Sequence, residues 1–427
     1  MINKILIANR GEIACRVIRT ARKLGYRTVA VYSEADAQAP HVSLADEAVC
    51  IGPAPAAESY LKGEVLLAAC RQTGANAIHP GYGFLSENAG FAQACRDAGV
   101  IFIGPSPEAI RVMGDKAGAK QEMIKAGVPT APGYLGADQN DEVLMAEGQR
   151  LGYPLLVKAV SGGGGRGMRL VHQDDELAQA IVSARREAQS AFGDGTLMLE
   201  RLILDGRHIE IQVFADSHGN AVYIGERDCT AQRRRQKVIE ESPSPVVSPA
   251  MREAMGRDAV LAAKAIHYCG AGTIEYIVDQ DLNYYFLEMN TRLQVEHPVT
   301  EMISGLDLVE WQLRVASGQP LPLTQDQITL SGHAIEARLY TEDPYAGFAP
   351  QTGRIAWWRP EQALFEGVRI DDAIRRLIAT LDDAPLLGLN HNARFLRDLV
   401  DHPRFRAGTM TTTLIDQWQT DGEPLLQ

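Results

Sequence analysis

Short apolar runs alternate with an amphipathic stretch in the N-terminal part of the chain. The runs at 5–8, 28–32, 77–79 and 101–103 predict buried strands, and residues 13–24 predict an amphipathic helix. Strands that alternate with helices are typical of a parallel, doubly wound sheet. The turn after the first strand lacks the GxGxxG fingerprint of dinucleotide sites. We therefore interpret this part as a scaffold domain that contributes an edge to a site elsewhere.

A pattern with a period of two follows in the second half of the chain. It predicts strands at 207–214, 272–278, 284–288 and 332–340. The first of these strands separates polar from apolar residues, with His208, Glu210 and Gln212 opposite Ile209, Ile211 and Val213. Taken alone, this polar face is typical of the solvent side of a sheet. A small αβ unit at about 131–200 precedes these strands, so the layout is scaffold, small insert and larger mixed domain.

The stretch EMNTRLQVE also alternates sharply between polar and apolar positions. In an extended chain its polar face carries Glu288, Asn290, Arg292, Gln294 and Glu296. The opposite face, which is Met289, Thr291, Leu293 and Val295, resembles a core face. Two carboxylates, two amides and a guanidinium in one row raise the question of which ligand they serve.

Composition and charge restrict the classes of protein. With 427 residues, 45% of them apolar, the chain is long enough for two or three domains of a soluble protein. The balance of 42 Lys+Arg against 54 Asp+Glu gives a net charge of −12, which disfavours nucleic acid and anionic membranes as partners. The six cysteines form no CxxC pair, which favours reduced thiols over disulfides or zinc. Without an apolar leader or membrane span, we expect a cytoplasmic protein.

A glycine run at 162–165, followed by Arg166 and Gly167, is not explained by stability, because each glycine costs about 0.5–1 kcal/mol relative to alanine. Such a loop suits backbone N–H groups that wrap phosphates, or a lid that opens and closes. No GK[ST] follows, so it is not a Walker A loop. A flexible surface linker is the alternative. The apolar strand before the loop bears Lys158, which favours phosphate binding.

Three segments are ambiguous from their residues alone. In HPGYGFLSEN, Tyr82 and Glu87 either line a ligand cleft or belong to a solvated turn. Lys116, in MGDK, is by itself typical of a solvated lysine. The basic run QRRRQK at 232–237 is interpreted as a local anion site, because the net charge argues against nucleic acid. A surface charge cluster is the alternative, since two glutamates follow.

Two carboxylates fall on neighbouring strands of one predicted hairpin. Glu275 interrupts an apolar strand, and the next turn leads into the strand that ends at Glu288. Antiparallel pairing can place the two side by side, where they repel unless a cation lies between them. Such oxygen ligands suit Mg²⁺, with Asn290 as a further ligand. A metal beside a glycine lid and lysines predicts a phosphoryl-transfer site, with Arg292 for an anion and Glu296 as a candidate base.

With these residues assembled, the chain resembles the biotin carboxylase component of biotin-dependent carboxylases, an ATP-grasp enzyme. The resemblance runs from Lys4 to about Asp372 and resumes to about Trp418. Its motifs are IANRGEIA at 7–14, HPGYGFLSEN at 79–88, MGDK at 113–116, GGGGRGM at 162–168, RHIEIQV at 207–213 and EMNTRLQVEHPVTE at 288–301. The stretch 338–354 is most similar to α subunits of bacterial acyl-CoA carboxylases of the methylcrotonyl and geranyl type.

The resemblance implies a mixed α/β and α+β architecture, the ATP-grasp fold. Its parts would be a Rossmann-like N-terminal domain at 1–115, a lid subdomain at 131–203, an ATP-grasp core at 204–330 and a C-terminal domain at 331–427. Between Asp372 and Ala373 the family carries a further segment, long enough for at least two strands, that this sequence lacks. Arg235 stands where the family usually has histidine or asparagine.

Carried over residue by residue, the resemblance implies sites for ATP and for Mg²⁺ or Mn²⁺. ATP phosphates would be held by Lys116, Lys158 and the lid glycines Gly163, Gly164, Gly165 and Gly167. Glu200 and Arg201 would lie at the adenine edge, with His208 and Gln232 near the nucleotide. The metal ligands would be Glu275, Glu288 and Asn290.

The same resemblance implies sites for bicarbonate and biotin. Bicarbonate would be positioned by Lys237, Arg292, Gln294 and the backbone at Val295. Glu296 would deprotonate it for attack on the γ-phosphate, giving carboxyphosphate, which breaks down to CO₂. Arg338 would stabilise the biotin enolate that captures CO₂, with Tyr82 near the biotin ring. Fixed cations and a metal are needed because two anions, ATP and bicarbonate, repel each other.

The implied partners are a biotin carboxyl carrier domain and a carboxyltransferase β subunit, in a homo-oligomer or multi-subunit carboxylase. The sequence ends without the Met-Lys-Met carrier motif, so we expect the biotinylated domain on another chain or on a removed C-terminal part. Two alternatives stay open. One is another ATP-grasp ligase that activates a different acid as an acyl phosphate, and the other is a catalytically weak structural subunit.

Overall fold

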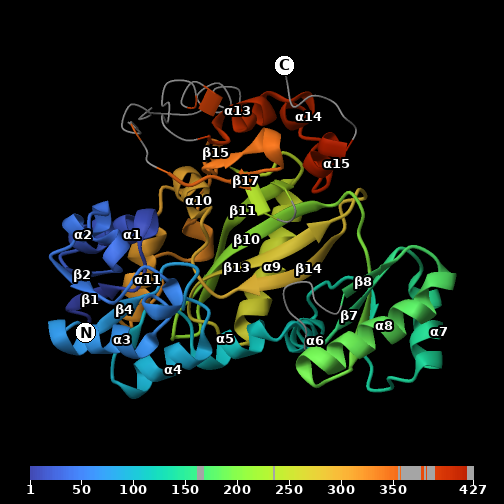
Figure 1. Cartoon of the computed structure of the whole chain (residues 1–427), viewed down its shortest axis with the longest axis horizontal. Helices are drawn as coiled ribbons and strands as arrows, with labels where there is room; N and C mark the ends of the chain where they lie inside the picture. Colours follow the sequence, from blue (N-terminus) through green and yellow to red (C-terminus); the bar gives the residue numbers. More distant parts are fainter. Residues whose placement is uncertain are drawn as a thin grey trace.

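In the part of the chain that it describes, the computed structural model contains three larger β-sheets and one two-stranded ladder (Figure 1). It describes the chain except for residues 161–167, 234–235, 354–355, 357–376, 379–380, 382–389 and 421–427. Several predictions therefore lie outside the described residues: Gly163, Gly164, Gly165 and Gly167, Arg235, and the segment missing between Asp372 and Ala373. The side chain of Lys116 also lies outside the description.

A five-stranded parallel sheet forms the N-terminal part, in the order β3-β2-β1-β4-β5. Its strands are β1 (Lys4–Ile7), β2 (Arg27–Tyr32), β3 (Glu47–Cys50), β4 (Ala77–His79) and β5 (Ile101–Phe102). Its helices are α1 (Gly11–Lys23), α2 (Pro40–Leu44), α3 (Gly63–Thr73), α4 (Ala89–Asp97) and α5 (Pro107–Gly114). The predicted parallel sheet is confirmed. The edge strand β3 was missed: none of its residues is buried, and its apolar run, at 48–50, is short.

A six-stranded antiparallel sheet forms the centre of the molecule, in the order β14-β13-β10-β11-β12-β15. Its strands are β10 (Arg207–Ala215), β11 (Ala221–Arg233), β12 (Gln236–Ser242), β13 (Gly270–Val278), β14 (Tyr284–Asn290) and β15 (Ala334–Ala337). The hairpin of β11 and β12 was not predicted, because its basic run masks the strand pattern. Gln232 and Arg233 in that run are buried, so for them a surface charge cluster is wrong.

The two faces of the central sheet have different partners. Ile209, Ile211 and Val213 pack against α9 (Pro249–Ala265) and α6 (Lys116–Ala126) in one hydrophobic core, as their alternation predicts. On the opposite face Phe214 packs against α11 (Leu308–Ala316) and the N-terminal sheet in a second core. The remaining polar positions of this face are covered by other polar groups rather than by water, since Glu210 and Gln212 are fully buried. A solvated polar face is therefore wrong for this strand.

A four-stranded sheet lies to one side of the central sheet, in the order β6-β9-β7-β8 (Figure 1). It consists of β6 (Gly133–Tyr134), β7 (Leu155–Ala159), β8 (Met168–Val171) and β9 (Leu197–Arg201), with helices α7 (Asp141–Leu151) and α8 (Asp174–Phe192). Its core is separate from that of the central sheet, as expected for a small insert.

The C-terminal elements pack on the β11–β12 hairpin. They are β16 (Glu342–Asp343), β17 (Ala349–Pro350), α13 (Ala393–Asp401), α14 (Pro403–Arg406) and α15 (Leu414–Thr420). Phe395, Leu399 and Ile415 share a core with Val238 and Ile239. Among the described residues, no helix combines the length and apolar character needed to cross a membrane.

The prediction for residues 288–296 holds only in its first part. The extended strand ends at Asn290, and the chain then turns into α10 (His297–Ser304). Glu296 is fully buried as the residue that precedes this helix, whereas Val295, expected on the core face, is only half-buried. The polar residues at 288–296 therefore do not lie in one extended row. The chain turns after Asn290, and this turn places Gln294 and Glu296 against the central sheet.

The contact between Phe214 and Trp311 links the central sheet to α11, with ring centroids 5.3 Å apart and an edge-to-face arrangement. Both side chains are buried. We expect Phe214→Ala to lower the free energy of unfolding by about 3–5 kcal/mol, because it leaves a cavity at this junction. Leu261→Ala on the exposed side of α9 is the control and should change it by less than about 0.5 kcal/mol. If Phe214→Ala and Leu261→Ala shift the midpoint of urea denaturation equally, the Phe214–Trp311 contact does not have this stabilising role.

Candidate active site

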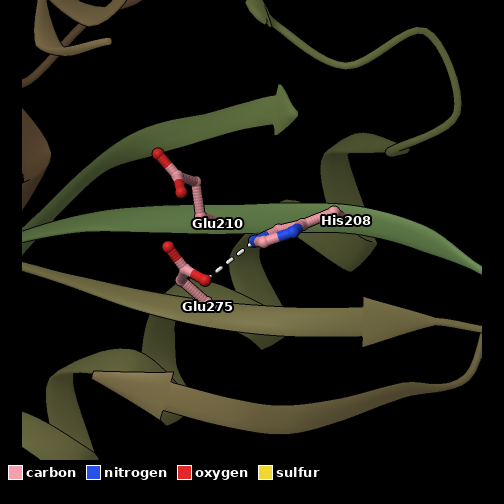
Figure 2. A group of neighbouring side chains, drawn as sticks. All are labelled: His208, Glu210 and Glu275. Atoms are coloured by element: carbon pink, nitrogen blue, oxygen red, sulfur yellow. Dashed lines mark ion pairs between the residues drawn. The ribbon is translucent and has the colours of Figure 1, made fainter. Parts of the chain in front are cut away.

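Neighbouring strands bring acidic and basic side chains together on the polar face of the central sheet. Glu210 on β10 is the register partner of Glu275 on β13, and Gln232 on β11 pairs with Lys237 on β12. Figure 2 shows His208, Glu210 and Glu275 on adjacent strands, with an ion pair of 2.9 Å between His208 Nε2 and a Glu275 oxygen. Ligand atoms of these three residues all lie within 4.8 Å of one another.

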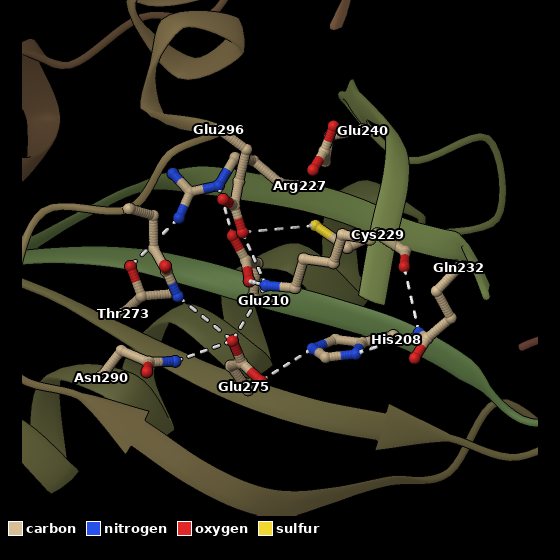
Figure 3. Close-up of polar contacts among 12 residues, drawn as sticks. His208, Glu210, Arg227, Cys229, Gln232, Glu240, Thr273, Glu275, Asn290 and Glu296 are labelled. Carbon is tan, nitrogen blue, oxygen red and sulfur yellow. Dashed lines mark hydrogen bonds and ion pairs between the residues drawn. The ribbon is translucent and has the colours of Figure 1, made fainter. Parts of the chain in front are cut away.

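Lys237 lies at the centre of the site, in contact with three acids, Glu210, Glu275 and Glu296. Figure 3 shows these three acids close together on the central sheet and at the start of α10. Its ammonium lies 2.6 Å from Glu210 Oε2, 2.9 Å from Glu275 Oε1 and 2.6 Å from Glu296 Oε1. Burial alone would lower the pKa of Lys237, but the surrounding acids, Glu210 foremost, raise it well above its ordinary value. Lys237 is therefore a permanent cation that holds side chains from two other strands, β10 and β13, and from the start of α10.

Arg227 supports this arrangement from the interior. It is fully buried and contacts Glu210 through Nε at 2.5 Å, while its Nη1 donates to Gln212 and Thr300 and its Nη2 donates to Thr273. Every nitrogen of the guanidinium thus has a partner. No pattern in the sequence pointed to this role, because Arg227 lies on β11, a strand that was not predicted.

Glu275 collects four donors. Besides Lys237 and His208, the Asn290 amide nitrogen donates to its Oε1 at 2.7 Å and the Gln294 amide at 3.1 Å. Burial would raise the pKa of Glu275, but His208 and then Lys237 lower it well below its usual range. The same pairing raises the pKa of His208 against the effect of burial. Glu275 is therefore a persistent anion.

The residues predicted as metal ligands lie together. Glu275 and Glu288 are register partners on β13 and β14, as predicted, and therefore share one face of the sheet. Asn290 ends the same strand and contacts Glu275. Two carboxylates and an amide oxygen are hard ligands, so their chemistry fits Mg²⁺. The cluster of His208, Glu210 and Glu275 is a second arrangement of ligand atoms in the same place.

Arg292 joins the N-terminal domain to the site. Its Nε donates to Glu87 at 2.8 Å and its Nη1 to the Gln294 side chain at 2.6 Å. Glu87 also accepts the backbone N–H of Thr291 at 3.0 Å. The HPGYGFLSEN segment therefore reaches the site through Glu87, which decides against a merely solvated turn. Tyr82 is half-buried against the core that contains Phe214.

Arg338 and Glu296 form the other side of the site. The Arg338 guanidinium contacts Glu296 Oε2 at 2.8 Å and Glu240 Oε1 at 2.5 Å. Glu296 thus binds Lys237 through one oxygen and Arg338 through the other. The buried thiol of Cys229 lies 4.0 Å from Glu296, and its pKa is raised well above the ordinary value by burial and then by Glu210. Glu240 is a further buried acid that sequence reasoning did not assign to the site.

Lys158 and Glu200 meet in the four-stranded sheet. Lys158 Nζ lies 2.5 Å from Glu200 Oε1, and Lys120 Nζ lies 2.7 Å from Glu200 Oε2. Burial would raise the pKa of Glu200, but Lys158 and then Lys120 lower it. Arg201 is exposed. Gln232 lies near His208, with 3.3 Å between its amide nitrogen and Nδ1. Lys120 was missed because nothing in its sequence context distinguishes it from a solvated lysine.

Comparisons with known proteins identify the family of this chain. The model of the family "Biotin carboxylase, N-terminal domain" matches residues 1–110, and "Carbamoyl-phosphate synthase L chain, ATP binding domain" matches residues 115–324. The chain is 51% identical over 441 residues to the mitochondrial methylcrotonoyl-CoA carboxylase subunit alpha of Dictyostelium discoideum, covering 97% of this chain and 63% of that relative. The chain belongs to the biotin carboxylase family. It spans somewhat less than two thirds of the length of that relative.

Two other members of the biotin carboxylase family are similar over almost their whole length. The biotin carboxylase of Halalkalibacterium halodurans is 50% identical, with 97% of each protein covered. The solved biotin carboxylase domain of Hydrogenobacter thermophilus 2-oxoglutarate carboxylase, a dimer in complex with MgADP, ADP and bicarbonate, is 42% identical, with a TM-score of 0.89 and 98% of each chain covered. The predicted biotin carboxylase fold and family, those of an ATP-dependent ligase, are confirmed.

Removal of Arg227 should destabilise the site as a whole. Arg227→Met leaves Glu210, Gln212 and both threonines without their donor, and we expect the free energy of unfolding to fall by about 3–5 kcal/mol. Arg257→Met is the control, because Arg257 forms an exposed ion pair with Glu253 at 2.6 Å and should contribute about 0.3–0.5 kcal/mol. Urea denaturation of both variants measures the difference, and a loss below about 1 kcal/mol for Arg227→Met would contradict a structural role.

Proposed function

We propose that this chain catalyses the ATP- and bicarbonate-dependent carboxylation of biotin on a carrier domain, through carboxyphosphate, as the first half-reaction of an acyl-CoA carboxylase. The observation that carries the proposal is the chain of contacts from Glu275 through Lys237 and Glu296 to Arg338. It joins the acids suited to a metal with a buried base and two cations. Such a site can hold two anionic reactants together and accept a proton between them.

The nucleotide would occupy the space between the small sheet and the central sheet. Lys116, Lys158 and the lid glycines would contact its phosphates, Glu200 and Arg201 the adenine edge, and His208 and Gln232 the nearby part of the nucleotide. Lys158 is now paired with Glu200 at 2.5 Å, so it would exchange or share this partner when phosphate binds. Glu275, Glu288 and Asn290 would hold Mg²⁺ or Mn²⁺. When bound, the metal would offset the negative charge of the phosphates.

Bicarbonate would bind between Lys237, Arg292, Gln294 and the backbone of Val295. Lys237 and Arg292 both make hydrogen bonds in this region, and their charges suit a small anion. Glu296 would accept the bicarbonate proton, and the resulting carbonate oxygen would attack the γ-phosphate. The burial of Glu296 excludes water from the reacting groups. Arg338, on the other side of Glu296, would stabilise the biotin enolate, with Tyr82 near the ring.

The proposed partners follow from the chemistry. Carboxybiotin requires a biotin carboxyl carrier domain, and its use requires a carboxyltransferase β subunit. The Dictyostelium relative is named as an alpha subunit, and the Hydrogenobacter structure is described as a dimer, which supports a homo-oligomer or multi-subunit carboxylase. We propose four domains with the boundaries 1–115, 131–203, 204–330 and 331–427. We also propose that the protein is located in the cytoplasm. One strand of the last range, β15, pairs with β12 of the central sheet.

Two substitutions test the proposed roles. Glu296→Ala should lower bicarbonate-dependent phosphate release by about 10²–10⁴-fold, because a positioned general base is lost. Arg338→Ala should instead remove the stimulation of this reaction by free biotin. Phosphate release is measured with and without bicarbonate and biotin, and Glu253→Ala, at an exposed position, is the control.

Unchanged turnover in both variants would remove the assigned roles. Release of phosphate with another carboxylic acid, and none with bicarbonate and biotin, would favour a different ATP-grasp ligase.

The metal assignment has its own test. Chelation of divalent cations should stop ATP turnover, and added Mg²⁺ should restore it. Glu288→Gln should raise the Mg²⁺ concentration for half-maximal turnover by at least about tenfold. Removing a residue that only supports a metal ligand already lowers metal affinity by about that factor or more. If the metal is held by His208, Glu210 and Glu275 instead, Glu288→Gln will leave this requirement unchanged.

A further inference from the structure

A pair of acids lies behind Arg338, in a position that none of the assigned roles explains. Glu240 on β12 and Glu336 on β15 are register partners across two antiparallel strands. Register partners point to the same face of a sheet, with their Cβ atoms about 4.5–5.5 Å apart. The two carboxyl groups are therefore neighbours, and Arg338 follows Glu336 by two residues.

The pair has unmet hydrogen-bonding capacity. Glu240 is fully buried, and its Oε1 accepts from Arg338 Nε at 2.5 Å. The second oxygen of Glu240 and the Oε2 of Glu336 are buried and have no hydrogen-bond partner among the described residues. Two buried carboxylate oxygens of neighbouring residues that both lack a donor are costly when both groups are ionised. A proton between them would supply the missing donor.

The charges around the pair also favour a retained proton. Glu240 is surrounded by Arg338, Lys237, Glu296 and the thiol of Cys229, and Glu336 by Arg338, Glu240, Glu296 and the exposed Glu12 at the start of α1. Lys237 is already shared among three other acids, and among the described residues Arg338 is the cation that pairs with both Glu240 and Glu296. Negative charge is therefore in excess here.

The pKa values of the two acids agree with this excess of negative charge. Burial raises the pKa of Glu240 to about 7, although Arg338 opposes the shift. Burial and then the charge of Glu240 raise the pKa of Glu336 well above its ordinary value. Two adjacent buried acids cannot both ionise easily, and such a pair titrates as a unit.

We propose that Glu240 and Glu336 share one proton and together position Arg338 for its part in biotin carboxylation. With the proton in place, the pair carries a single negative charge and leaves Arg338 able to turn from Glu240 toward the substrate. When the proton is lost, the second negative charge holds the guanidinium between Glu240 and Glu296. The pair touches Arg338 and no reactant, so both acids are positioning residues, and this part of the proposal rests on the proposed function.

Glu336→Gln removes the shared proton but keeps the shape of the side chain, so it tests the proton without disturbing the fold. The glutamine amide can donate to Glu240 in place of the shared proton, which favours the ionised form of Glu240 and leaves the pair with one titratable carboxyl group. Glu241→Gln is the matched control, because Glu241 is the next residue on β12, is half-buried and pairs with His333 at 2.9 Å instead. Both variants keep the shape of the side chain.

Infrared difference spectroscopy of the full chain tests the proton directly. The wild type should show the carbonyl band of a buried protonated carboxyl group at pH 6 and lose it as the pH rises through the pKa of the pair. The band should be missing in Glu336→Gln and kept in Glu241→Gln. Absence of such a band from the wild-type minus Glu336→Gln spectrum would overturn the shared proton. If the variant fails to fold, the wild-type titration decides alone.

Kinetics tests the positioning role. In the wild type, kcat/KM for free biotin should fall at least severalfold as the pH rises through the pKa of the pair, whereas KM for ATP should not follow this change. Glu336→Gln should lack this fall, and Glu241→Gln should show it. A fall that persists unchanged in Glu336→Gln would refute the role. If biotin does not stimulate phosphate release by the wild type, the proposed function is refuted instead. The infrared result would still test the shared proton.

Discussion

The structure depends on one buried cation. Lys237 lies within 2.9 Å of Glu210, Glu275 and Glu296, which come from β10, β13 and the start of α10. Three buried carboxylates without this ammonium would repel each other, and each would bear the cost of leaving water. Arg227 compensates the charge of Glu210, and Arg338 compensates that of Glu296. The site is therefore a continuous network of alternating charges, in which each group fixes the position of the next.

The two faces of the central sheet divide the work. The face toward α9 is apolar and supplies hydrophobic stabilisation, whereas the opposite face is apolar only where α11 and the N-terminal sheet cover it. The polar remainder can stay buried because nearly every group in it has a partner of opposite charge or a hydrogen bond. Among the described residues, Glu240 and Glu336 each keep a buried oxygen without a hydrogen-bond partner, and an incomplete network beside a cation is a place where a proton can be held.

The local patterns in the sequence were good guides to individual strands. The alternation at 207–214 predicted which side chains of β10 face the core, and the separation of Glu275 and Glu288 by one turn predicted their pairing. The β11–β12 hairpin was missed because its basic residues are buried by partners distant in the sequence, such as Glu342, 3.5 Å from Arg233. Residues 291–296 misled for a related reason, since a row of polar groups with a period of two also arises when a chain turns to enter a helix.

The sequence by itself determined the family, the parallel N-terminal sheet and the residue types of the site, because motifs and apolar periodicity are local properties. Only the tertiary structure decided which charges meet. Arg227, Lys120 and Glu240 have no distinguishing pattern around them, and each contacts an acid or guanidinium from 17 to 98 positions away in the chain. The charge state of a buried group depends on such distant neighbours and on the exclusion of water, and both exist only after the chain has folded.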